Sequence, residues 1–200
     1  MEKKQNVTLV TAKDSVVDVI LKYRACDEWE NLLKYVMEPN RVRPLMQSYY
    51  AKNGVSSKEL DFNTVKNALV KLKENLFVTK GSGVHGFYVV KTNEGYKVDW
   101  EATVEYNPVE LLELENMPGK TIEWRGSIMM FSSNNEWYHN YYGTTNLYAK
   151  KGTKADNDMF EIMKDKNTHH IIVKVKRTTD GAGNPMNEIV EVVSKNSSKY

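Results

Sequence analysis

The chain has 200 residues, of which 40% are apolar and 27% are charged, a balance typical of a folded globular protein. Its 28 basic and 26 acidic residues give a formal net charge of +2, which excludes a strong overall field toward nucleic acid or anionic membranes. Cys26 is the single cysteine, so an intrachain disulfide and a thiol-only zinc site are both excluded.

No apolar run approaches the roughly 20 residues that a membrane-spanning helix needs. The start of the chain also lacks an apolar stretch of signal-peptide length. We therefore expect either a cytoplasmic protein or an exported one whose targeting segment is absent from this chain.

Short amphipathic helices are expected in the first quarter of the chain. Asp14 or Ser15 can cap the first helix, and Asp27 begins a second one. A third helix is expected from about residue 41 to residue 52, because apolar side chains recur there at helical spacing. Gly54 follows as a typical helix end.

The stretch from residue 87 to residue 104 predicts two strands joined by a tight turn at Asn93-Glu94-Gly95. Apolar and polar residues alternate along its second half, and successive side chains of a strand point to opposite faces. We therefore expect Val98 and Trp100 to be buried and Lys97 and Asp99 to be exposed.

The second half of the chain is expected to consist mainly of strands. A short helix is predicted over residues 109–116, a polar loop over 152–158 and one helical turn over 159–164. Gly126 marks a bulge or bend within the strand that contains it. The strands and the aromatic-rich stretch between them cover residues 121–131, 137–149, 171–175 and 189–193.

Helices followed by strands indicate an α+β fold in which a curved, mainly antiparallel sheet wraps around the amino-terminal helices. We expect one domain over residues 14–193. Residues 1–13 are expected to form a flexible arm, and residues 194–200 a frayed end.

Three segments carry a resemblance to a known family: RVRPLMQSYY at residues 41–50, GFYVV at 86–90 and GYKVDW at 95–100. On these segments the chain resembles the NTF2-like superfamily, and especially its uncharacterised bacterial members. The resemblance covers roughly residues 14–193 and implies a cone-shaped fold related to the cystatin-like fold. It also implies that an Asp, His or Tyr inside the cone would move protons in an enzyme, and that relatives dimerise through the sheet.

The histidines do not have the spacing of metal ligands, so we expect no metal site and no cofactor. His169 and His170 are adjacent, and neighbouring strand residues point to opposite faces. The remaining histidines are His85 and His139.

Aromatic side chains supply the candidate pocket or interface. They either line an apolar pocket with polar tips or pack in the core. The WYHNYY segment holds too many aromatic residues for all of them to be core, so we expect part of it at a pocket mouth or an interface. The candidates are Tyr49, Trp100, Trp124, Trp137, Tyr138, Tyr141 and Tyr142.

The sequence favours a non-enzymatic binding or assembly module that uses either the cone cavity or the open sheet face. A homodimer through the sheet face and a small apolar ligand are the expected partners. No nucleic-acid partner is expected, because Lys174, Lys176 and Arg177 form only a short basic patch. Two alternatives remain open: a small-molecule isomerase or dehydratase using Asp99 or a cavity tyrosine, and an accessory dimerisation domain.

Overall fold

The computed structural model describes residues 15–81, 86–131 and 138–200, and it shows an α+β protein. Contacts divide the chain into two compact units. The described residues up to Val104, together with Tyr200, form the amino-terminal unit, and Glu105–Lys199 form the barrel unit. The expected arm over residues 1–13 lies outside the described residues, and cooperative folding of residues 14–193 as one domain stays a prediction.

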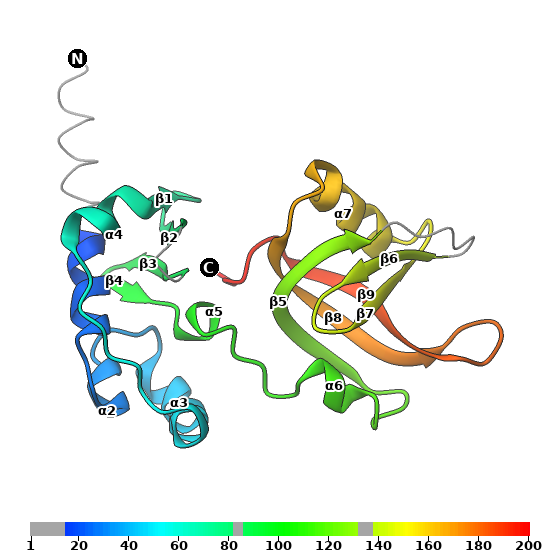
Figure 1. Cartoon of the computed structure of the whole chain (residues 1–200), viewed down its shortest axis with the longest axis horizontal. Coiled ribbons are helices and arrows are strands. Elements are labelled where there is room, and N and C mark those ends of the chain that lie inside the picture. The colour runs from blue at the N-terminus through cyan, green and yellow to red at the C-terminus, as the bar shows by residue number, and fades with distance from the viewer. Residues whose placement is uncertain (1–14, 82–85, 132–137) are drawn as a thin grey trace, which may run out of the picture. The chain divides into compact units, whose positions relative to one another are not determined.

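Helices precede a small sheet in the amino-terminal unit, and one helical turn follows it (Figure 1). Pro39 occupies the first turn of its helix, where its missing N–H costs little, and Gly54 ends that helix with a φ of 67°. The Asp61 side chain caps the next helix by accepting a hydrogen bond from the Thr64 backbone N–H. The helices cover residues 15–24, α2 (Trp29–Leu32), α3 (Pro39–Asn53), α4 (Phe62–Ala68) and α5 (Trp100–Thr103).

The sheet of this unit is antiparallel, with strand order β1-β2-β3-β4. Gly95, at a φ of 106°, permits the tight turn between the last two strands, as the sequence predicted. Apolar residues of β2 and β3 pack with Ala102 of α5 into one buried cluster. The strands are β1 (Leu69–Lys71), β2 (Leu76–Thr79), β3 (Tyr88–Thr92) and β4 (Gly95–Val98).

The segment after Val98 differs from the strand that the sequence predicted. Val98 and Trp100 are buried as expected, but the strand ends at Val98 and α5 begins at Trp100. Asp99 is only 4% exposed, and its Oδ1 accepts a hydrogen bond from the Ala102 N–H at 3.1 Å. Lys97 is half-buried, with its Nζ donating to the Lys34 carbonyl at 3.0 Å. The expected exposure of Asp99 is therefore wrong, because this side chain caps a helical turn.

The barrel unit is built from strands closed in the order β5-β6-β7-β9-β8 (Figure 1). Neighbours are antiparallel except β7 and β9, and a helix, α7, lies between β7 and β8 in the chain. This is the strand order of the Greek-key barrel known as the OB-fold. The elements are α6 (Leu111–Leu114), β5 (Thr121–Phe131), β6 (Tyr138–Tyr142), β7 (Asn146–Lys150), α7 (Lys154–Ile162), η1 (Met163–Asp165), β8 (His169–Thr179) and β9 (Pro185–Ser194).

Strands that the sequence analysis placed in one curved sheet thus fall into two sheets. The four strands before Val104 pair with one another, apart from a bridge between Val98 and Val36, and β5 pairs with β6 and β8. Alternation along a strand fixes which side chains share a face, but it does not identify the partner strand. The expectation of a single sheet was wrong for this reason.

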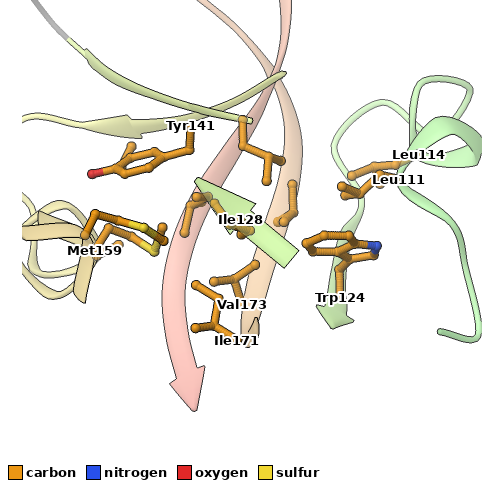
Figure 2. Packing of buried hydrophobic residues seen from close by; sticks show 14 residues of the cluster. Leu111, Leu114, Trp124, Ile128, Tyr141, Met159, Ile171 and Val173 are labelled. Atoms are coloured by element: carbon orange, nitrogen blue, oxygen red, sulfur yellow. The ribbon is translucent and has the colours of Figure 1, made fainter. Parts of the chain in front are cut away.

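The core of the barrel unit takes Trp124 and Ile128 from β5, although Arg125 beside Trp124 is buried as well. Trp124 and Ile128 point inward and are buried with residues of β8 (Figure 2). Figure 2 shows Trp124 beside Leu111 and Leu114. A Cβ on Gly126 would lie 2.4 Å from the Trp124 ring, so this glycine gives the indole its space.

Two further expectations differ from the structure. Residues 154–158 of the predicted loop over residues 152–158 form the start of α7 instead, because the Thr153 side chain accepts a hydrogen bond from the Asp156 N–H at 3.2 Å. The end of the chain is packed instead of frayed. Ser197 and Ser198 are fully buried, and Arg125 Nε donates to the Ser197 carbonyl at 2.6 Å.

Candidate functional site

The candidate aromatic residues divide between the two units. Tyr49 and Trp100 belong to the amino-terminal unit. Trp124, Tyr138, Tyr141 and Tyr142 belong to the barrel unit, whereas Trp137, like His85, lies outside the described residues. These residues were predicted as one set, and the structure separates them by position and by role.

A pocket of about 290 Å³ lies within the amino-terminal unit. Tyr49 lines it, and Trp100 is buried behind the tyrosines, 5.6 Å from Tyr49 between ring centroids. The volume is at the small end of the range of roughly 300–1,000 Å³ for ligand sites. The lining consists of Tyr23, Arg24, Cys26, Leu32, Tyr49, Tyr50, Asn53, Gly54, Val55, Ser56, Phe87, Thr103 and Val104.

Hydrogen bonds fix the tyrosine hydroxyl groups of this pocket. Trp100 Nε1 donates to the Tyr50 hydroxyl at 3.1 Å, and the hydroxyl groups of Tyr23 and Tyr50 are 3.3 Å apart. Burial raises the pKa of Tyr23 well above its usual value, and burial also raises the pKa of Cys26. Because both pKa values are raised, the Tyr23 hydroxyl and the Cys26 thiol stay protonated near neutral pH and are poor bases. The described lining contains no carboxylate and no imidazole that could act as a base instead.

Arg24 supplies the charge of the pocket. Its Nη1 donates to the Ser56 carbonyl at 2.5 Å, and its guanidinium carbon lies 5.9 Å from the centroid of the Phe87 ring. Among the described residues it forms no ion pair. Arg24 was not predicted from sequence, because its approach to Ser56 and Phe87 depends on the tertiary fold.

In the barrel unit, the outward positions of three neighbouring strands carry a second concentration of aromatic residues. Met129 is paired with Tyr142 across β5 and β6. Tyr138 and Tyr148 meet edge to face with ring centroids 6.5 Å apart. Exposure is 41% for Met129, 59% for Phe131 and 48% for Tyr142. We call the set Met129, Phe131, Tyr138, Tyr142 and Tyr148 the aromatic face.

Trp124 and Tyr141 are core residues and do not belong to this face. Both are at least 98% buried in the barrel cluster. Burial, followed by the nearby Asp156 charge, raises the pKa of Tyr141. Neither the Trp124 Nε1 nor the Tyr141 hydroxyl has a hydrogen-bond partner among the described residues.

His139 also has a structural role. Its Nδ1 lies 2.5 Å from Oδ1 of Asp156, and Oδ2 of that carboxylate accepts a hydrogen bond from the Gly152 N–H at 3.0 Å. Asp156 is 4% exposed, so the pair fastens the start of α7 to β6. His169 and His170 contact Asp165 and Glu105 respectively, and both of these carboxylates are more exposed than that of Asp156. The part of the chain that the structure describes contains no cluster of potential metal ligands.

Comparison of the chain with protein-family models, with curated proteins and with solved structures found no match. The resemblance to the NTF2-like superfamily therefore stays a prediction. Within the described residues, no helix is both long enough and apolar enough to cross a membrane.

Proposed function

We propose that the chain is a non-enzymatic assembly module in which the aromatic face of the barrel unit binds the same face of a second copy. The observation that carries this proposal is the exposure of Met129, Phe131 and Tyr142 on two adjacent strands. Contiguous exposed apolar side chains mark interaction surfaces in folded proteins. Each large side chain contributes about 1.5–3 kcal/mol when it is fully buried.

The geometry favours contact between faces over contact between strand edges. A closed barrel has no free edge strand to extend. The outward-facing side chains of β5, β6 and β7 instead lie in rows across the strands. One row places Met129 beside Tyr142, and another places Asn140 between Phe131 and Tyr148. Two copies related by a twofold axis would bring identical patches together, as in the commonest homodimers.

The charge on and around the aromatic face supports a second copy of the chain as its binding partner. The side chains of the aromatic face are uncharged near neutral pH. Charges of both signs border it, because Lys150 is paired with Tyr138 and Glu188 with Tyr148, so a twofold arrangement can set opposite charges against each other. The whole chain has a formal net charge of +2, and a net charge near zero favours association.

A nucleic-acid strand fits this face less well, because it needs a basic groove that follows the phosphates. On the neighbouring strand β8, Lys174 is 2.6 Å from Glu191. Lys199 is 2.6 Å from Glu123. Acidic side chains at Glu188 and Asp180 act on Tyr138, whose pKa is raised first by burial and then by these charges.

Binding is also favoured over catalysis by the state of Asp99. Its carboxylate caps α5 through the Ala102 N–H, which is a structural task. A proton-transfer site needs a base together with a second group that orients it or stabilises charge. The described lining of the pocket offers neither a carboxylate nor an imidazole.

Sedimentation equilibrium of the full chain across a concentration series tests the proposal. We expect a monomer–dimer equilibrium that is weakened at least about tenfold in Phe131→Ser, because an exposed apolar anchor is lost. Leu112→Ser is the matched control, since Leu112 is 60% exposed on α6 and outside the aromatic face.

A wild-type chain that stays monomeric at high concentration would contradict the proposal, as would equal weakening by both substitutions. Oligothymidylate provides the competing test. If it binds and Phe131→Ser abolishes that binding while the chain remains a monomer, the face is a nucleic-acid platform instead.

A further inference from the structure

We infer that the pocket of the amino-terminal unit binds a small monoanion with an aromatic body, such as an aryl carboxylate. All of its described lining residues belong to that unit. The inference therefore stands independently of self-association through the barrel unit.

The charge of the ligand follows from Arg24. A guanidinium group carries five N–H donors, and the hydrogen bond that Arg24 Nη1 donates to the Ser56 carbonyl uses only one of them. The described lining residues include this one cation and no carboxylate. A partly buried cation with spare donors is satisfied best by a carboxylate, whose two oxygens match the guanidinium fork.

The shape of the ligand follows from the rings around Arg24. Tyr49 and Tyr50 meet edge to face with centroids 5.1 Å apart, and Phe87 lies beneath the guanidinium group. Such walls favour a flat apolar ring through offset or edge-on contacts. A volume of about 290 Å³ limits the ligand to a small molecule of one or two rings.

The neighbouring hydroxyl groups suit an uncharged part of the ligand better than a second anion. Burial raises the pKa of Tyr49 and of Tyr23, so both phenols stay neutral near physiological pH. They line the site without adding charge. The site therefore favours a ligand that places one negative charge at Arg24 and is apolar elsewhere.

Isothermal titration calorimetry of the full chain with phenylacetate and with its neutral isostere phenylacetamide tests this inference. We expect the acid to bind more tightly than the amide. Arg24→Gln should weaken phenylacetate binding by about 10- to 150-fold, the usual effect of losing hydrogen bonds to a charged group. Phenylacetamide binding should change little.

Arg43→Gln is the matched control, because Arg43 is exposed on α3 and does not line the pocket. Equal binding of the acid and the amide to the wild-type chain would overturn the inference, and that comparison needs no variant. Unchanged phenylacetate binding in a folded Arg24→Gln chain would overturn it too. So would a failure of both compounds to bind at millimolar concentration.

Discussion

The two units use their aromatic residues in opposite ways. In the amino-terminal unit, tyrosines from separate helices converge with Phe87 around a pocket, and Trp100 donates its N–H to the Tyr50 hydroxyl. In the barrel unit, strand alternation sends Trp124 and Tyr141 into a closed core and leaves Phe131 exposed. Convergence of this kind forms a concave site, whereas alternation divides side chains between a core and an outer face.

The largest effects should come from removing the tryptophan of each core. We expect Trp100→Ala and Trp124→Ala each to lower the free energy of unfolding by about 3–5 kcal/mol, since each empties a large buried site. Hydrogen exchange read strand by strand should accelerate in β1–β4 for the first variant and in β5–β9 for the second. Equal acceleration in all strands for either variant would instead support one cooperative domain over residues 14–193.

A smaller loss of stability should distinguish a buried histidine–carboxylate pair of the barrel unit from an exposed one. His139→Ala removes a partner from the buried Asp156 carboxylate, so we expect a loss of about 1–3 kcal/mol in stability. His169→Ala is the matched control, because its partner Asp165 lies at an exposed position. Thermal or urea unfolding measures both, and equal losses would show that the Asp156 pair does not fasten α7.

The smallest effect concerns alkaline pH and the last residue of the chain. Burial, then a hydrogen bond with Glu38, raises the pKa of Tyr200 from 10.0 to about 12. The folded state therefore holds this proton more tightly than the unfolded state. The resulting stability is fully present below pH 10 and is lost as the pH rises to about 12.

Urea unfolding of the wild-type chain and Tyr200→Phe at several alkaline pH values tests this linkage. The stability difference between the two chains should be constant below pH 10 and should shrink toward about pH 12. Tyr141→Phe provides the comparison in the barrel unit, where burial also raises the tyrosine pKa. A difference that grows with pH would contradict the assigned direction.

Alternation of polar and apolar residues predicted some strands from sequence, but it did not show where helix caps interrupt them. The strand Thr121–Phe131 was predicted from sequence, and polar and apolar residues alternate over its first five positions, before Gly126. Residues 96–104 alternate as well, yet Asp99 is a strong helix cap and the chain turns there. The start of α7 was missed although Thr153 and Asp156 have the spacing of a capping pair.

The candidate site could be predicted only in part, because it depends on contacts between distant segments. Tyr49 was proposed as a pocket residue and lies in the pocket lining. Arg24 reaches Ser56 only through the packing of the first helix beside the end of α3. Closure of the barrel likewise depends on pairing Thr121 with Lys176, and no local pattern identifies such a pair.

Hydroxyl-radical footprinting of the full chain across a concentration series tests the central claim most directly, since it reads the two units in one sample. We predict that labelling of Met129, Phe131 and Tyr142 falls as the concentration rises. Labelling of Phe160, which is 46% exposed outside the aromatic face, and of Tyr49 in the pocket should stay constant. Concentration-dependent protection of Tyr49 or Phe160 with none at Met129, Phe131 and Tyr142 would contradict assembly through the aromatic face.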